Sequence, residues 1–161
     1  MLKVILERVL RLLFNFRSHM EAKNKCTVRI TLVDDNAIFR LIFSNMLSSF
    51  SLCPLEIRTF DNALEFLDQF PCPQGDAIAT DILFVDINMP FMTGWELMDK
   101  LETDVTDFTQ SSAIYIISSS SSKSDLEQVK NYSFIKGYVL KPVNKQVLFD
   151  IIKKHIAVDS L

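Results

Sequence analysis

The chain has 161 residues, of which 48% are hydrophobic and 23% charged, and its formal net charge is −3. This length and balance indicate one soluble globular domain with an ordinary core. The acidic balance argues against the basic footprint of a nucleic-acid-binding protein. The three cysteines, Cys26, Cys53 and Cys72, include no C-x-x-C pair, so we expect no disulfide framework or zinc site, and a reducing, cytoplasmic location.

The first sixteen residues form a distinct unit of the sequence. Polar residues recur every four positions along an otherwise apolar segment, at Lys3, Glu7, Arg11 and Asn15. This spacing predicts an amphipathic helix that is too short and too charged to span a bilayer. Such a helix can lie on a membrane surface, or pack against a partner or a second copy of the chain.

The leader also has an alternative explanation. Residues 18–20, Ser-His-Met, resemble a cloning remnant before an initiator methionine, so Met20 is an alternative start of the natural protein. We assign residues 1–26 to an N-terminal helix and linker, and residues 27–158 to the main domain.

From Val28 onward, predicted strands alternate with predicted helices. Apolar and β-branched runs predict strands over residues 28–33, 55–60, 82–85, 113–117 and 138–140. Amphipathic spacing predicts helices over residues 36–50, 61–70, 95–101, 124–132 and 145–156. Asp61 is the expected cap of the second helix, and Ser124 with Glu127 forms a candidate capping box for the fourth. Alternation of this kind predicts an α/β fold of flavodoxin-like type, a doubly wound (βα)5 unit with a five-stranded parallel sheet.

Polar side chains follow four of these strands at the point where each strand ends. They are Asp34 and Asp35, Asp86, Ser118 and Lys141. Because the carboxyl ends of parallel strands line one crevice, we expect these side chains to converge. Three carboxylates held together repel one another, and Mg²⁺, which takes oxygen ligands, would relieve that repulsion.

The same cluster suggests phosphoryl chemistry. A carboxylate such as Asp86 can attack phosphorus and form an aspartyl phosphate. This transfer needs positioning and charge neutralisation, which Mg²⁺ and the ammonium group of Lys141 would supply. The hydroxyl group of Ser118 would donate a hydrogen bond to the same phosphoryl group.

Each of these residues also has an ordinary structural explanation. Asp34 or Asp35 can cap the following helix, and Asp86 can begin a turn. Ser118 and Lys141 can be solvated loop residues. These explanations are independent of one another, yet together they would have to place every residue at the same edge of the sheet. The convergence therefore favours a shared site.

Four segments of this pattern resemble the receiver domain of two-component response regulators. They are VDDN at residues 33–36, VDINMPFMTG at 85–94, IISS at 116–119 and YVLKP at 138–142. The resemblance covers residues 27–156 and implies that Asp86 is the phosphoacceptor. It also implies that Asp34 and Asp35 hold Mg²⁺, that the backbone carbonyl of Asn88 completes the metal site, and that Lys141 is the lysine of the family.

The resemblance implies a switch and partners as well. Ser118 and Tyr138 would be the switch hydroxyl and the switch aromatic residue. The phosphoryl donor would be a sensor histidine kinase or a histidine phosphotransfer protein, and a homodimer through the last helices is compatible with the family. A downstream protein would contact an output face formed by the fourth helix, fifth strand and fifth helix. Apolar residues of this face can equally be core residues: Leu126, Val129, Tyr132 and Tyr138.

The sequence departs from the family pattern in a long polar segment at residues 103–112 and in the serine run after Ser118.

Two other functions are compatible with parts of the pattern. A degenerate receiver would bind partners without phosphorylation, and a haloacid-dehalogenase-type phosphatase also uses a strand-end aspartate with Mg²⁺. That phosphatase expects Asp-x-Asp after its first strand, whereas this chain has adjacent Asp34 and Asp35. No glycine-rich loop follows the first strand, which excludes a P-loop nucleotide binder. We therefore expect a signalling domain rather than an enzyme.

Overall fold

The computed structural model describes residues 27–69 and 79–158. Five parallel strands form one sheet, in the order β2-β1-β3-β4-β5. The strands are β1 (Val28–Val33), β2 (Leu55–Phe60), β3 (Ile82–Val85), β4 (Ala113–Ser118) and β5 (Ile135–Leu140). This order reverses at β1, as in flavodoxin-like doubly wound folds, and the predicted fold class is confirmed. The helix predicted in the first sixteen residues lies outside the described residues.

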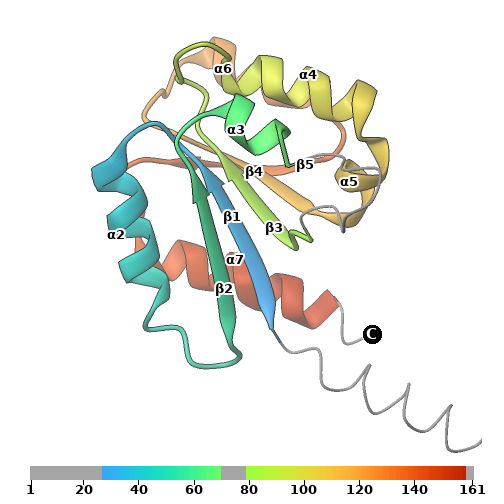
Figure 1. Cartoon of the computed structure of the whole chain (residues 1–161). Coiled ribbons are helices and arrows are strands. Elements are labelled where there is room, and N and C mark those ends of the chain that lie inside the picture. The colour runs from blue at the N-terminus through green and yellow to red at the C-terminus, as the bar shows by residue number, and fades with distance from the viewer. Residues whose placement is uncertain (1–26, 70–78, 159–161) are drawn as a thin grey trace, which may run out of the picture.

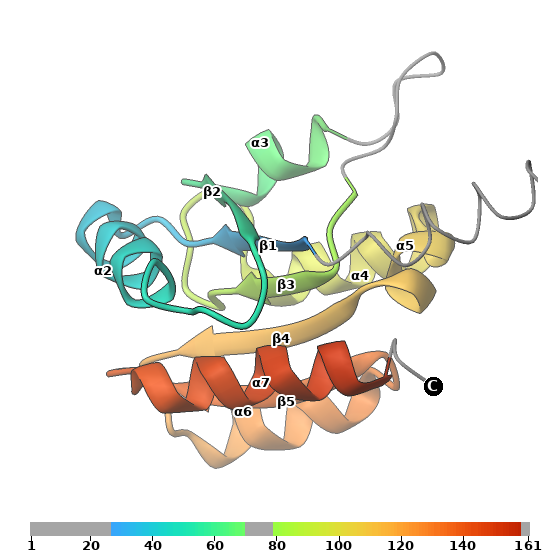
Figure 2. The same cartoon turned by 90° about the horizontal axis from the view of Figure 1, so that it is seen from below.

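Helices cover both faces of the sheet (Figures 1 and 2). They are α2 (Ala37–Leu47), α3 (Ala63–Leu67), α4 (Gly94–Asp104), α5 (Thr106–Ser111), α6 (Lys123–Gln128), the 3-10 helix η1 (Val129–Asn131) and α7 (Lys145–Val158). No helix in the described ranges is long and apolar enough to cross a membrane.

Two apolar layers hold the helices onto the sheet. On one face, Phe43 of α2 and Leu148 of α7 pack in the same buried cluster as Phe84 of β3. The rings of Phe43 and Phe84 meet edge to face, with centroids 5.3 Å apart. On the other face, the helices α3, α4 and α5 pack over a second cluster that includes Phe66 and Phe108. Both faces of the central strands β1, β3 and β4 are therefore buried, as their continuous apolar sequences require.

Polar side chains at the helix starts fix where α2, α3 and α4 begin. Asn36 accepts a hydrogen bond from the backbone N–H of Phe39, and Thr93 forms a capping box with Glu96 at the start of α4. At α3 the cap is Asn62, not Asp61 as predicted, because the amide oxygen of Asn62 is the group that accepts from the helix backbone.

The start of α6 also differs from the prediction. Its cap is Ser122, whose hydroxyl oxygen accepts from the backbone N–H of Asp125 at 3.1 Å. The predicted cap, Ser124, instead lies inside the helix. Both serines have an acidic residue three positions later, so the sequence pattern alone fits either start.

Two other local features differ from the sequence prediction, at α5 and at β5. The polar segment at residues 103–112 contains the helix α5, which buries Phe108. The strand β5 begins at Ile135, three residues before the predicted start at 138. On α2, Ile38 and Ile42 are exposed, because Phe43 and Leu47 form the buried face.

The described chain enters and leaves the domain at the same end. β1 begins at Val28, and α7 passes along the sheet and ends at Val158 near that starting edge (Figure 1). The opposite edge, where the parallel strands end, is formed by the loops that lead into the helices.

Candidate functional site

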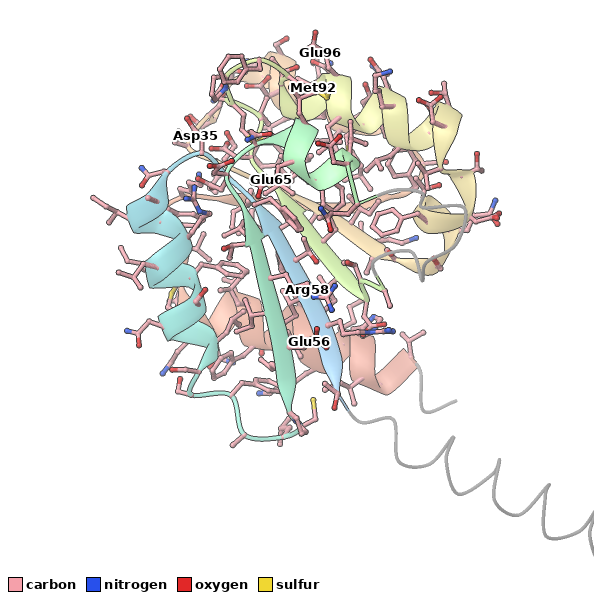
Figure 3. The ribbon with its side chains drawn as sticks, viewed as in Figure 1. Asp35, Glu56, Arg58, Glu65, Met92 and Glu96 are labelled. Atoms are coloured by element: carbon pink, nitrogen blue, oxygen red, sulfur yellow. The ribbon has the colours of Figure 1, made fainter. Side chains whose placement is uncertain are left out.

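Three carboxylates meet at the carboxyl edge of the sheet. One oxygen from each of Asp34, Asp35 and Asp86 lies within 4.8 Å of the others. The register explains this, because Val33 pairs with Val85 and the residues that follow them are therefore neighbours. Asp34 and Asp86 are buried, whereas Asp35 is exposed where β1 passes into α2 (Figure 3). The cluster therefore has one open side.

Lys141 joins two of the three carboxylates. Its Nζ donates to Asp34 Oδ2 at 2.6 Å and to Asp86 Oδ2 at 2.8 Å. The backbone N–H of Lys141 donates to the carbonyl of Ser118, which ties the end of β5 to the end of β4. Burial alone would lower the pKa of Lys141, but the hydrogen bonds to Asp34 and Asp86 outweigh it and raise that pKa. The lysine is therefore charged at neutral pH.

Asp34 is the most deeply buried member of the cluster, with no exposed surface. Burial raises its pKa, and the hydrogen bond from Lys141 only partly opposes this effect. Its Oδ1 accepts from the backbone N–H of Asn36 at 3.0 Å, while its Oδ2 accepts from Lys141. Both oxygens are thus held in place, so the carboxylate is fixed in orientation.

Two residues of the first turn of α2 contact this cluster and were not predicted. The ring of Phe39 lies beneath Lys141, with the ammonium nitrogen 4.3 Å from the ring centroid, which is a cation–π contact. Arg40 donates from Nη1 to the backbone carbonyl of Asp34 at 2.6 Å. Sequence spacing identified α2 but could not show which of its residues turn back toward the strand ends.

The other predicted site residues lie around the same edge. Asn88 is exposed, and its backbone N–H donates to Asp86 Oδ1 at 3.4 Å. Ser118 is fully buried, and its Oγ accepts from the backbone N–H of Ser120 at 3.1 Å. Tyr138 is partly buried, and burial raises the pKa of Tyr138. Its hydroxyl group donates to the carbonyl of Ser120 at 2.7 Å, so both switch candidates contact one residue.

The predicted output face is only partly exposed. Leu126 on α6 is 42% exposed, whereas Tyr132 is buried against α4 and belongs to the core. Val129 packs against the edge of that core. The alternative explanation given for these residues, ordinary packing, therefore holds for Tyr132.

The donor set of the cluster suits a hard divalent cation. It consists of three carboxylates and contains no thiol or imidazole, and such oxygen-only groups bind Mg²⁺ or Ca²⁺ rather than zinc or copper. Two buried carboxylates provide fixed oxygens, and the exposed Asp35 leaves a side open to water and to an incoming group. The residues present therefore fit the predicted metal.

Comparison with known proteins agrees with this geometry. The family model of the response regulator receiver domain matches residues 30–153. The two-component response regulator ARR3 of Arabidopsis thaliana is 28% identical over 119 residues, which are 72% of this chain and 50% of that protein. The chain thus spans about half the length of this curated relative.

Solved structures share the fold. The chemotaxis protein CheY4 of Vibrio cholerae is 20% identical, with a TM-score of 0.63 over 80% of this chain and 98% of that chain. The phosphorylated cyanobacterial phytochrome response regulator RcpA is 23% identical, with a TM-score of 0.65 over 80% of this chain and 90% of that chain. Since the family model spans most of the chain and the site residues lie within it, the chain belongs to the response regulator receiver domain family of two-component signalling.

Proposed function

We propose that Asp86 accepts a phosphoryl group, with Mg²⁺ bound, from a phosphohistidine on a sensor histidine kinase or a histidine phosphotransfer protein. One observation carries this proposal. The ammonium group of Lys141 contacts both Asp34 and Asp86 inside a cluster of three carboxylates. This arrangement supplies a nucleophile, a positive charge beside it and oxygen ligands for a cation, which are the parts that phosphoryl transfer to an aspartate needs.

In the transfer, the P–N bond of the phosphohistidine breaks as a bond forms between phosphorus and an oxygen of Asp86. The released imidazole takes up a proton. Asp86 Oδ2 is held by Lys141 at 2.8 Å, whereas Oδ1 accepts only a long hydrogen bond from Asn88. Oδ1 is therefore the oxygen better placed to attack, and Lys141 remains near enough to contact the transferred group.

Three groups of residues would support this step. Asp34, Asp35 and Asp86, with the backbone carbonyl of Asn88, would hold Mg²⁺, which when bound neutralises charge on the phosphoryl oxygens. Ser118 would donate a hydrogen bond to one of those oxygens. The hydroxyl of Tyr138, which contacts the carbonyl of Ser120, would shift with the loop that follows Ser118.

We propose residues 27–158 as the receiver domain. Its output would be a protein contact on the surface of α6 and β5, where Leu126 is exposed. This function would place the domain in the cytoplasm and requires no reaction on an external substrate. The match to a signalling family supports this function over the phosphatase alternative.

The test is intact-mass spectrometry after incubation with Mg²⁺ and acetyl phosphate. Wild type should gain the mass of one phosphoryl group, and chelation of Mg²⁺ should abolish the gain. Asp86→Asn should gain nothing. Asp61→Asn is the matched control, because Asp61 follows β2 at the same edge but is exposed and outside the carboxylate cluster. It should be phosphorylated like wild type.

A well-folded wild type that gains no phosphoryl group from acetyl phosphate or from a phosphohistidine protein would overturn the proposal. It would instead favour a receiver that binds partners without phosphorylation. An adduct that persists in Asp86→Asn would place the acceptor at another residue.

A further inference from the structure

Ser120, two residues after the switch candidate Ser118, has every polar group engaged. Its backbone N–H donates to Ser118 Oγ at 3.1 Å, and its carbonyl accepts from Tyr138 Oη at 2.7 Å. Its own hydroxyl donates to the carboxylate of Asp125. The N–H of Ser120 therefore holds the oxygen of Ser118 in position as an acceptor.

Asp125 accepts hydrogen bonds from the serine run on one side and from α4 on the other. One oxygen accepts from Ser120 and from Ser122 Oγ, the latter at 2.8 Å. The other oxygen accepts from the indole Nε1–H of Trp95 at 3.4 Å. The hydrogen bonds from Ser120 and Ser122 lower the pKa of Asp125, which keeps the carboxylate ionised at neutral pH.

Trp95 links the carboxylate of Asp125 to α4, the helix that follows Asp86 in the chain. It lies in the first turn of α4, and its ring stacks on Tyr132 with centroids 5.8 Å apart and planes 8° apart. Tyr132 in turn donates to Asp99 of α4 at 2.6 Å. Hydrogen bonds therefore cross between α4 and the α6–η1 segment in both directions, where the two lie close together (Figure 1).

We infer that Asp125 is a positioning residue for the phosphorylation of Asp86, and that it acts through Ser120 on the hydroxyl of Ser118. Ser120 can orient Ser118 only while Ser120 itself is held in position. Asp125 holds Ser120 by a hydrogen bond, and the hydrogen bond from Trp95 ties Asp125 to α4. Without the Asp125 carboxylate, the segment from Ser118 to Ser122 is not held in advance. It must then be ordered at the moment of phosphoryl transfer, which slows the reaction. This inference rests on the proposed function of Asp86.

The serine run at residues 118–122 could have been a flexible polar loop, which is the explanation that the sequence favoured for Ser121 and Ser122. Three of its hydroxyl groups are instead committed to contacts, at Ser118, Ser120 and Ser122. Ser121 lies between them, is exposed, and is not part of these contacts. The chain thus provides a matched control within the same loop.

The experiment measures the rate constant of phosphate uptake from acetyl phosphate with Mg²⁺ by intact-mass spectrometry. Asp125→Ala and Ser120→Ala should each slow uptake roughly five- to tenfold, the equivalent of about one ordinary hydrogen bond, because they act on the hydroxyl of Ser118 indirectly. Ser120→Thr keeps the hydroxyl and should restore the rate, and Ser121→Ala should match wild type. Because both residues act in one path, the double variant should be little slower than either single variant.

A second measurement separates positioning from simple loss of structure. Trp95 is the single tryptophan of the chain, so its emission reports the contact between α4 and α6. Addition of beryllofluoride and Mg²⁺ should change this emission in wild type and change it less in Asp125→Ala, while urea midpoints show that both proteins are folded. If folded Asp125→Ala takes up phosphate at the wild-type rate, this inference is overturned while the proposed function stands. A wild type that takes up no phosphate would overturn both this inference and the proposed function.

Discussion

The backbone of Asp86 lies directly against Gly94. A Cβ placed on Gly94 would overlap the carbonyl oxygen of Asp86 and come within 2.8 Å of the Cα of Ile87. The N–H of Gly94 also donates to the carbonyl of Ile87 at 2.9 Å. The first residue of α4 is therefore packed against the acceptor strand, and only a residue without a side chain fits there.

Gly94→Ala should thus displace the backbone that carries the acceptor. We expect a loss of about 1–3 kcal/mol in the free energy of unfolding, the usual cost of forcing a methyl group into a packed site. Uptake of phosphate at Asp86 should also slow. Urea denaturation and intact mass measure the two effects. Gly137→Ala is the control, because its Cβ would meet ring atoms of Tyr115 at 3.2 Å and no backbone atom. Equal losses in the two variants would contradict the prediction.

Asp34→Asn should stabilise the metal-free protein at neutral pH. The pKa of Asp34 is raised by burial, so its ionised form is disfavoured in the fold. A group whose pKa is raised on folding contributes fully to the free energy of unfolding below its unfolded-state pKa. This contribution is lost as pH rises through its folded-state pKa. Lys141 keeps Asp86 as a partner in this variant. We expect a gain on the order of 1 kcal/mol in EDTA at pH 7.

The pH dependence checks the sign of this effect. In urea denaturation the advantage of Asp34→Asn over wild type should shrink as pH falls toward 4, because Asp34 then becomes protonated in both states. Asp61→Asn, which changes an exposed carboxylate, should show little difference at either pH. An advantage that grows at low pH would contradict the assignment of a raised pKa.

Lys141→Met should have the opposite effect. It leaves two buried carboxylates, Asp34 and Asp86, without their shared positive charge. Loss of one partner of a buried charge pair costs on the order of 3 kcal/mol. Urea denaturation in EDTA should show this loss, and adding Asp34→Asn to the variant should recover part of it. Full stability of Lys141→Met would mean that Lys141 contributes nothing to holding the cluster together.

Magnesium should raise the stability of wild type in a saturable way. Binding to the folded state alone adds about 2.7 kcal/mol at a hundredfold excess over the Kd. Asp35→Asn should weaken the dependence on Mg²⁺ without lowering stability in EDTA, because Asp35 is exposed and outside the apolar core. Thermal denaturation across a Mg²⁺ titration measures both. An unchanged titration in Asp35→Asn would remove this residue from the metal site.

Tyr132 should make stability fall at high pH. Burial, together with the hydrogen bond to Asp99, raises the pKa of Tyr132 from 10.0 to about 12. The unfolded chain therefore loses this proton first, and stability falls as pH rises between these two values. Tyr132→Phe should flatten the fall while losing stability at pH 7, where the contact with Asp99 is gone. The free energies of unfolding of wild type and Tyr132→Phe are measured from urea denaturation at several pH values. An equal fall in both proteins above pH 10 would contradict this prediction.

The sequence predicted β1, β2 and β3 at their observed bounds, because β1 and β3 are rich in β-branched and apolar residues, β2 contains alternating apolar residues, and each is followed by an aspartate. β5 was predicted too short, since Lys136 and Gly137 interrupt its apolar pattern, although Ile135 and Gly137 still pair with Ile114 and Tyr115 of β4. The helix α5 was missed for a related reason. Its sequence, TDFTQS, has weak helix propensity, and the burial of Phe108 beside Phe66 favours it.

The candidate site was predictable to the extent that strand ends define it. Asp34, Asp86 and Lys141 follow strands, and parallel pairing alone brings strand ends together. Phe39 and Asp125 are different, because their contacts depend on how a helix is rotated and on which serine begins α6. Neither quantity is encoded in residue spacing, so these contacts required the structure.

The position of the domain's two described ends has a practical consequence for biosensor design. β1 begins and α7 ends at one edge of the sheet (Figure 1), and the carboxylate cluster lies at the opposite edge, where the strands end. The six residues of β1 separate these two edges by roughly 20 Å. A domain anchored to a chip or fused to a fluorescent protein through either end would therefore present Asp86 toward the solution, where a phosphoryl donor can reach it.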